Sequence, residues 1–322
     1  MSAERRTPPR LALVVSDGRP TRPAGSGPQF ISFGEALTDL VTRGGSDFTA
    51  RPGGAGLNVA RAMAALAVPS AWAGALSLDS FGDQLLAACL DAGLDEALIR
   101  RVEAAPLLAV VDRLDPPHYF FLGNGAADLQ FDPLALPASD LQALRWAHFG
   151  GISLVREPLG TRLEVLACQL KARGVKLSFD PNHRVVMGTQ DLPRLQRFIA
   201  LADAIKLSDE DLRGYFPGQA PEAALQWLRA LNPGATWLYT RGADGATLYP
   251  PDGAALHAPA RPVAVVDTVG AGDASVAGLL LALLRGEPPA RQLQFAIANA
   301  SLACQGSGAV APPLAALLAA VA

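Results

Sequence analysis

The stretch "VVDTVGAGDAS", residues 265–275, decides how this chain is interpreted. An apolar run leads into Gly270, Ala271 and Gly272, and an alanine-rich helical segment follows. Glycines lack a Cβ, so the backbone N–H groups at such a helix start can converge on one point. Together with the helix dipole they form a site for a phosphate or a developing negative charge. Asp273 places a carboxylate in the same turn, and this pairing needs a chemical reason.

Two common phosphate-binding loops do not fit this turn. A dinucleotide fingerprint, G-x-G-x-x-G, would need a glycine where Ser275 stands, and a Walker loop occurs nowhere in the chain. What remains is a site where Asp273 takes the proton from an attacking hydroxyl while the amides of residues 271–273 stabilise a phosphoryl group. Since phosphoryl transfer depends mainly on positioning and charge neutralisation, a carboxylate of ordinary pKa is sufficient. For Asp273 alone, complementing the helix terminus is the competing role.

The bulk composition excludes several classes of protein. The chain has 322 residues, 50% of them hydrophobic, which permits one large α/β domain or two small ones. Its formal net charge of −3 shows no basic excess for nucleic acid or an anionic membrane surface. No apolar run approaches the roughly 18 residues of a membrane span. The three scattered cysteines are typical of reduced thiols, so we expect a cytoplasmic protein.

From Phe30 onward, short apolar runs alternate with segments of helical spacing. Strands that are apolar on both faces and alternate with helices predict an α/β fold: a doubly wound, mostly parallel sheet with helices on both faces. Ligands in such folds bind outside the carboxyl ends of the strands. The strand-like stretches are 30–34, 146–150, 175–180, 204–208, 236–240 and 263–267.

Three segments depart from this rhythm. Residues 38–54 and 106–123 have the polar alternation of half-buried strands. We expect these inserts to pair into a small β-sheet lid over the edge of the main sheet where ligands bind. Residues 1–28 are rich in Pro, Arg and Gly, and we expect them to form a disordered extension. Residues 29–322 then form one domain.

Six motifs, taken together and in order, resemble those of the ribokinase-like sugar kinases, also called the PfkB carbohydrate kinase family. "DTVGAGDAS" resembles the C-terminal signature of that family, "RPGGAGLNVARAMAAL" (51–66) its other signature, and "FGEALTDL" (33–40) its opening strand. The remaining matches are "SFDPNHR" (178–184), "AIKLSDEDL" (204–212) and "TRGADGATLY" (240–249). The resemblance runs from about residue 30 to the C-terminus. It implies a ribokinase-like fold and a sugar kinase that uses ATP and Mg²⁺.

The resemblance also implies a sugar site. It assigns sugar contacts to Asp39, Gly53, Gly54 and Asn58, with Arg184 of "DPNHR" completing the set. Aspartate and asparagine offer acceptors and donors that suit vicinal hydroxyls. Taken by residue type alone, the two glycines also fit an ordinary turn, and the asparagine fits a helix cap.

The motifs look most similar to the fructokinase branch, so fructose is the first candidate substrate. Leu122 and Gly123 stand where that branch and the 2-keto-3-deoxygluconate kinases usually carry a Tyr-Arg pair. Without that arginine a sugar acid lacks a bidentate partner, which counts against ketodeoxygluconate and slightly weakens fructose. Ribose, a nucleoside, ketodeoxygluconate or another ketose stay open as alternatives. A noncatalytic sugar- or nucleotide-binding regulatory protein is the alternative from a different class.

At the nucleotide end, the resemblance implies an indirect, water-mediated Mg²⁺ role for Asp211. Asp267 with the backbone of Val269 matches a monovalent-cation site of some relatives, which implies K⁺ use; bracing of the turn is the alternative for Asp267. Lid-edge dimers occur among the relatives, so a homodimer is left open. The implied nucleotide-binding residues are Lys206, Ser208, Thr240, Gly242, Gly245 and Asn299.

Overall fold

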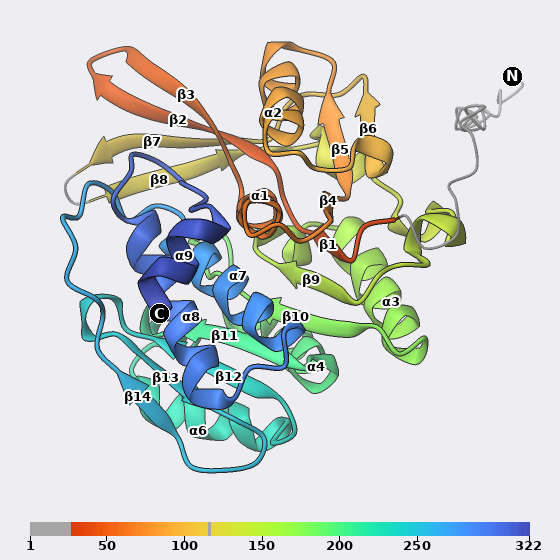
Figure 1. The fold of residues 1–322 in the computed structure, drawn as a ribbon. Coiled ribbons are helices and arrows are strands. Elements are labelled where there is room, and N and C mark those ends of the chain that lie inside the picture. Colours follow the sequence, from red (N-terminus) through yellow and green to blue (C-terminus); the bar gives the residue numbers. More distant parts are fainter. Residues whose placement is uncertain (1–26, 115–116) are drawn as a thin grey trace, which may run out of the picture.

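The computed structural model describes residues 27–114 and 117–322. Its main body is a sheet covered by helices on both faces, with a smaller sheet projecting from one side (Figure 1). The predicted doubly wound α/β class is therefore confirmed. The expected extension, residues 1–28, lies outside the described residues except for its last two positions. Within the described ranges, no helix is long and apolar enough to cross a membrane.

The main sheet has eight strands among the described residues, in the order β14-β13-β12-β11-β10-β9-β1-β4. The strands from β12 to β4 pair in parallel, whereas β13 and β14 pair antiparallel at one edge. Five of the six predicted strands are present. The bounds are β1 Phe30–Phe33, β4 Ser70–Trp72, β9 Trp146–Gly150, β10 Lys176–Asp180, β11 Ala204–Ser208, β12 Thr236–Thr240, β13 Ala246–Tyr249 and β14 Leu256–Ala258.

The two inserted segments pair with each other in a separate four-stranded sheet, in the order β3-β2-β7-β8. We call it the small sheet; it extends beyond the main body in Figure 1. Its strands are β2 Leu37–Gly44, β3 Asp47–Gly53, β7 Leu108–Leu114 and β8 Pro117–Leu122. A two-stranded parallel sheet, β5 Gly74–Ser77 with β6 Ile99–Val102, lies beside it.

The helices divide between the two faces of the main sheet. Side chains of α3, α4, α5 and α6 belong to one buried apolar cluster, and those of α1, α2, α7, α8 and α9 belong to the other. Alternate residues of the strands feed the two clusters, for example Ile31 and Phe30 of β1. The α-helices are α1 Ala55–Ala65, α2 Ser80–Asp91, α3 Leu159–Ala172, α4 Leu192–Leu201, α5 Asp209–Tyr215, α6 Pro221–Leu231, α7 Ala271–Leu284, α8 Pro289–Ala303 and α9 Leu314–Val321. Short 3₁₀ helices are η1 Glu96–Leu98, η2 Ala127–Gln130, η3 Pro133–Ala135, η4 Ala138–Leu141, η5 Ile152–Val155, η6 Thr189–Asp191 and η7 Gly242–Asp244.

The predicted strand at 263–267 is wrong. This segment is irregular, and Val265 and Val266 are 62% and 63% exposed. The edge of the sheet is instead closed by β14, after which the chain leaves the sheet. The backbone N–H groups of Val266 and Asp267 donate to the carbonyl of Cys304, so they have no strand partner. Apolar content alone cannot distinguish a buried strand from an exposed apolar loop.

Candidate active site

The turn that opens α7 has the geometry expected from its glycines. Gly270 precedes the helix with φ 80°, a left-handed conformation that favours glycine. A Cβ built on Gly270 would lie 2.7 Å from Cβ of Ala309, so the loop at 305–312 closes tightly over the turn. Asp273 follows in the first turn of α7 and is only 7% exposed. The helix start and its carboxylate therefore form one rigid unit.

Burial raises the pKa of Asp273 to about 7. The hydrogen bond from Asn58 and the charges of Arg184 and Lys206 oppose this shift, while the charge of Asp180 adds to it. From the sequence, an aspartate of ordinary pKa was considered sufficient for phosphoryl transfer. In the structure, the pKa of Asp273 is near neutrality instead. A carboxylate with a pKa near the working pH is a better proton acceptor than an ordinary aspartate.

Two segments separated by more than two hundred residues meet at this carboxylate. Asn58, in the first turn of α1, donates from Nδ2 to Oδ2 of Asp273 at 3.0 Å. Helices α1 and α7 pack against each other, which holds the two side chains together. The second polar atom of the amide, Asn58 Oδ1, is buried and has no hydrogen-bond partner among the described residues. A buried acceptor without a partner is costly, so this atom is available to a ligand donor.

Three other residues predicted to bind the sugar lie on the small sheet or directly after it: Asp39, Gly53 and Gly54. Asp39 on β2 pairs in register with Arg51 on β3, and a Cβ built on Gly53 would lie 2.2 Å from Asp39 Oδ2. Only glycine at that position lets the carboxylate lie against the backbone. Burial raises the pKa of Asp39 to about 6, Arg184 and Arg51 oppose the shift, and Glu35 adds to it. Gly54, with φ 103°, begins α1.

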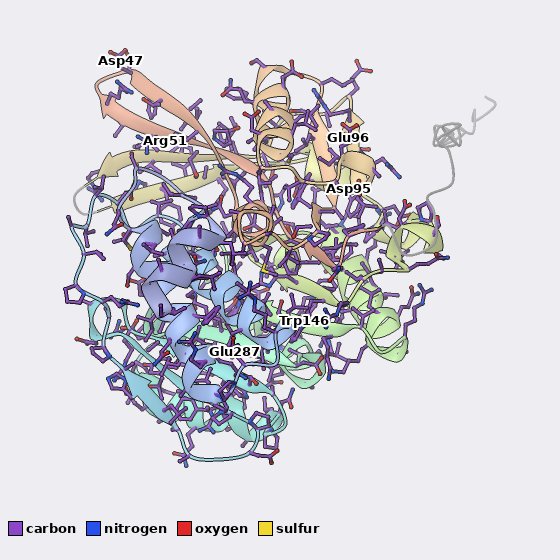
Figure 2. All side chains as sticks on the ribbon, viewed as in Figure 1. Asp47, Arg51, Asp95, Glu96, Trp146 and Glu287 are labelled. Carbon is purple, nitrogen blue, oxygen red and sulfur yellow. The ribbon has the colours of Figure 1, made fainter. Side chains whose placement is uncertain are left out.

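Arg51 also connects the small sheet to the main body. Figure 2 shows it on β3, away from the strand's tip at Asp47. Its Nη1 donates to Ser307 Oγ at 3.3 Å and lies 3.8 Å from Asp267 Oδ2. Because Asp39 lies opposite Arg51 in the strand pair, the arginine joins the predicted sugar region to the loops beside the α7 turn.

A buried ammonium group lies directly beside the turn that opens α7, which we call the anion turn (residues 270–273). Lys206 on β11 is 6% exposed, and its Nζ lies 3.2 Å from Asp180 Oδ2 and 3.5 Å from Asp211 Oδ2. A Cβ built on Gly272 would lie 3.4 Å from that Nζ. Burial acts against the charge, but the two carboxylates raise the pKa of Lys206, so it stays protonated. The N-terminus of α7 and the ammonium of Lys206 together place positive charge at this end of the site.

Ser208 and Asp211, both predicted to serve the nucleotide end, form hydrogen bonds within the protein. Ser208 caps α5 by accepting from the N–H of Asp211 at 3.0 Å, and Asp211 Oδ2 accepts from the N–H of Ser208 at 2.7 Å. Asp211 Oδ1 accepts from the N–H of His183 at 2.7 Å. Across residues 27–114 and 117–322 no group of three or more His, Cys, Asp or Glu side chains could hold a metal ion. Both oxygens of Asp211 are therefore committed within the protein.

Three more predicted residues either hydrogen-bond to backbone groups or lie in a tight turn. Asn299 is completely buried and donates from Nδ2 to the carbonyl of Ala274 at 2.8 Å, which ties α8 to the start of α7. Its Oδ1 is buried and has no hydrogen-bond partner among the described residues. Gly245 has φ 84° and lies within a tight turn, where a Cβ would lie 2.2 Å from the carbonyl oxygen of Ala258. Asp267 braces the α7 turn by accepting from the N–H groups of Val269 and Gly308.

Thr240 and Gly242 stand at the end of β12, and Gly242 opens η7 with φ 52°. The same edge of the main sheet carries Lys206 and the α7 turn, because β11 and β12 are parallel neighbours. Arg184 lies in the loop after β10, where Nη1 donates to the carbonyl of His183 at 2.8 Å. Thr240, Gly242 and Arg184 thus lie at the carboxyl ends of β12 and β10.

Sequence reasoning missed several residues of this region. Glu35 is 5% exposed and Asp180 is 2% exposed, yet both are carboxylates within the site. Each lay inside a quoted motif, and their position at a strand's carboxyl end was the signal that could have identified them. The side chains of four exposed valines beside the α7 turn were also given no role, although the backbone of Val269 was: Val265, Val266, Val269 and Val310.

Comparison with known proteins now defines the family. Residues 29–316 match the profile of the pfkB family carbohydrate kinases. The chain is 36% identical over 259 residues to a fructokinase from Klebsiella pneumoniae, an alignment that covers 78% of this chain and 83% of the relative.

Two solved structures are similar over most of their length. One is the fructokinase from Vibrio cholerae O395 in its fructose, ADP and calcium ion bound form, with a TM-score of 0.77 and 30% identity, covering 91% of this chain and 98% of that one. The other is the aminoimidazole riboside kinase from Salmonella enterica complexed with aminoimidazole riboside and an ATP analog, with a TM-score of 0.77 and 29% identity, covering 91% and 99%.

Proposed function

The chain belongs to the pfkB family of carbohydrate kinases, and from that membership we propose that it transfers the γ-phosphoryl group of MgATP to a primary hydroxyl of fructose. The membership confirms the predicted ribokinase-like fold and the predicted phosphotransferase class. Fructose is favoured by the fructokinase relatives, and the observation that carries the reaction is the buried carboxylate of Asp273 at the anion turn.

In this mechanism Asp273 accepts the proton of the attacking hydroxyl. Its raised pKa of about 7 supports that role, because the ionised form is present at neutral pH and still has useful basicity. We assign the N–H groups of Gly272 and Asp273 to the transferred group, whereas the N–H of Ala271 donates to the carbonyl of Thr268 at 3.1 Å. The helix dipole of α7 favours the negative charge of the transferred group. In-line transfer then needs mainly the positioning of the two substrates.

The sugar lies between the small sheet and α1. Asp39, Gly53, Gly54 and Arg184 contact its hydroxyls, and Asn58 Oδ1 accepts from the hydroxyl next to the one that reacts. That assignment is supported by the unpartnered, buried Oδ1 and by the hydrogen bond from the same amide to the base. We propose that the small sheet acts as a lid, which excludes water from the reacting groups.

The nucleotide lies over the α7 turn and the end of β12. Lys206 supports the phosphates from behind Gly272, while Ser208, Thr240, Gly242 and Gly245 shape the adjoining backbone. The exposed valines at 265, 266, 269 and 310 offer an apolar surface to the adenine ring, since they adjoin the same turn. Asn299 acts indirectly, by holding the carbonyl of Ala274.

The donor set fits Mg²⁺ held mainly by the nucleotide. With both oxygens of Asp211 engaged, the ion would be bound by phosphate oxygens and water, and Asp211 would act through water. When bound, Mg²⁺ neutralises charge on the phosphates. Asp267 and the carbonyl of Val269 lie where two loops meet and offer the oxygen ligands that K⁺ accepts.

We also propose a domain division and an assembly state. Residues 29–322 form one kinase domain, with inserts near 38–54 and 106–123 forming the lid, and residues 1–28 are an extension dispensable for catalysis. The family match over residues 29–316 supports this division. Kinetics that collapse on deletion of residues 1–28 would reject it. We further propose that the protein is cytoplasmic and forms a homodimer. Sedimentation of the purified protein tests the assembly state.

A second candidate substrate is a riboside, because the aminoimidazole riboside kinase is about as similar in structure as the fructokinase. ATP consumption by purified protein with Mg²⁺, with and without K⁺, should be measured on fructose, ribose, tagatose, ketodeoxygluconate, aminoimidazole riboside and no sugar. We expect turnover on fructose that disappears in Asp273→Asn. Turnover on the riboside alone would replace fructose as substrate, and turnover on no compound would reject the proposed reaction.

A further inference from the structure

A buried carboxylate behind the sugar site contacts three segments at once. Glu35 follows β1 and is 5% exposed. Its Oε1 accepts from the N–H of Ala55 at 3.4 Å, and its Oε2 accepts from the N–H and the hydroxyl of Ser153, both at 3.3 Å. Burial raises the pKa of Glu35, and the backbone hydrogen bonds and the charge of Arg184 oppose that shift. None of the proposed chemical steps uses this group.

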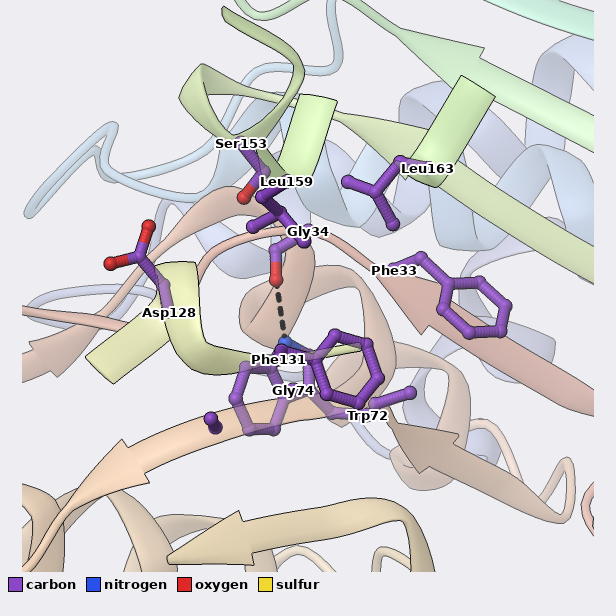
Figure 3. Close-up of a pocket in the computed structure, with 11 residues that line it drawn as sticks. Phe33, Gly34, Trp72, Gly74, Asp128, Phe131, Ser153, Leu159 and Leu163 are labelled. Atoms are coloured by element: carbon purple, nitrogen blue, oxygen red, sulfur yellow. Dashed lines mark hydrogen bonds between the residues drawn. The ribbon is translucent and has the colours of Figure 1, made fainter. Parts of the chain in front are cut away.

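The surroundings are shaped to fit Glu35. Gly151 has φ 66°, and a Cβ there would lie 2.2 Å from Glu35 Oε1. A Cβ on Gly54 would lie 2.4 Å from the backbone carbonyl oxygen of Glu35, which accepts from the N–H of Leu57 at 3.2 Å. Figure 3 shows the adjacent Gly34, whose carbonyl accepts from Trp72 Nε1 at 2.9 Å. The backbone on both sides of the carboxylate is therefore fixed.

Helix α1 needs a cap from outside its own sequence. It begins at Gly54, which has no side chain, and its first turn contains no acidic residue. The N–H groups of a first helical turn lack partners within the helix, and a negative charge there is stabilising. Glu35 supplies the acceptor for the N–H of Ala55 from outside the helix. Asn58, which contacts Asp273, lies in that same turn.

We propose that Glu35 is a positioning residue that caps α1 from outside and thereby holds Asn58 in its hydrogen bond to Asp273. The inference rests on the proposed function, since it concerns how that base is oriented. In this proposal Glu35 holds the start of α1 in place, and the start of α1 holds the amide of Asn58. That amide in turn orients the carboxylate of Asp273.

The first test is a double-mutant cycle between Glu35→Gln and Asn58→Ala, measured on kcat with fructose. Glutamine keeps the shape, but its amide nitrogen cannot accept from an N–H, so Ala55 or Ser153 loses its acceptor. We expect Glu35→Gln to lower kcat about tenfold in the wild-type background, since small displacements of catalytic groups have effects of this size. In the Asn58→Ala background we expect less than about a twofold further loss. Equal losses in both backgrounds would overturn the proposal.

The second test needs no turnover: the titration midpoint of the Asp273 carboxyl carbon is followed by ¹³C NMR, with Asp273→Asn identifying the signal. Any loss of negative charge at residue 35 can by itself only lower that midpoint, because like charges raise a carboxyl pKa. Losing the hydrogen bond from Asn58 raises it. We therefore expect an upward shift in Glu35→Gln, and a downward shift or no shift would overturn the inference.

Two further variants separate this role from general stability. Asp203→Asn is the matched control, because Asp203 also accepts from a backbone N–H, that of Leu177 at 2.9 Å, but at the opposite end of the sheet. It should lower the melting temperature without shifting the midpoint. If Glu35→Gln does not fold, Ser153→Ala removes one of the hydrogen bonds and should give a smaller shift in the same direction. Failure of the proposed function would be visible separately, as wild-type protein without sugar-dependent ADP formation.

Discussion

Asn58 Nδ2 donates to Asp273 Oδ2 at 3.0 Å, which joins the start of α1 to the start of α7. The glycine pair assigned to the sugar directly precedes α1, and the anion turn opens α7. The same amide leaves its buried Oδ1 without a partner among the described residues. In the proposed function, this single side chain links sugar binding to the orientation of the base.

Replacement of Asp273 by Asn should reduce kcat by about 10² or more with little change in sugar affinity, because the proton acceptor is lost while the contacts remain. Steady-state kinetics and direct sugar binding measure the two effects. Unchanged turnover would show that another group, or water, accepts the proton.

The same substitution should stabilise the fold at alkaline pH. Burial raises the pKa of Asp273 from 3.8 to about 7, so the folded state binds the proton more tightly than the unfolded state. The free energy of unfolding therefore falls as pH rises from about 4 to about 7, and the carboxylate costs on the order of 1–4 kcal/mol above that range. Thermal melts should show a higher melting temperature for Asp273→Asn at pH 8 and a smaller difference at pH 4. Equal differences at both pH values would contradict the raised pKa.

Replacement of Asn58 by Ala should move the acid limb of the kcat–pH profile to higher pH. The limb reports ionisation of the base, and the hydrogen bond from Asn58 favours the ionised form. Since hydrogen bonds to charged groups contribute about 1.5–3 kcal/mol, the expected shift is about one to two pH units. Asn232→Ala is the control, because Asn232 donates to the carbonyls of Ile199 and Ala202 and should affect stability without moving the limb.

A methyl group at residue 53 should displace Asp39. A Cβ there would lie 2.2 Å from Asp39 Oδ2, so Gly53→Ala should raise the KM for sugar about tenfold or more while the KM for ATP stays within about twofold. Gly234→Ala is a matched control, since its Cβ would meet only Asn232 Oδ1 at 3.7 Å. A normal sugar KM in Gly53→Ala would argue against Asp39 as a sugar contact.

Removal of the buried ammonium should affect both stability and chemistry. Lys206→Met leaves Asp180 and Asp211 facing each other without a cation, a change that typically costs about 3–5 kcal/mol. The double variant Lys206→Met/Asp180→Asn should regain stability but not turnover, because the charge behind Gly272 is still absent. Lys176→Met, which removes a mostly exposed partner of Asp203, should cost less than about 1 kcal/mol. Recovery of full kcat in the double variant would limit Lys206 to a structural role.

The sequence predicted the fold class and five strands of the main sheet because apolar spacing is a local property. It also predicted that the two inserted segments are strands, since polar alternation is equally local. It failed at residues 263–267, where the valines are exposed although their spacing resembles that of a buried strand. Whether an apolar run pairs depends on the neighbouring strand, and β14 already occupies that edge.

At the site, the local pattern around residues 270–273 was sufficient to indicate an anion turn with a carboxylate beside it. Only the tertiary structure decided what surrounds that carboxylate. Burial sets the pKa of Asp273, and α1 brings Asn58 to it from the other end of the chain. Glu35 and Asp180 became visible for the same reason: desolvation and long-range contacts depend on packing between segments, which no single stretch of sequence contains.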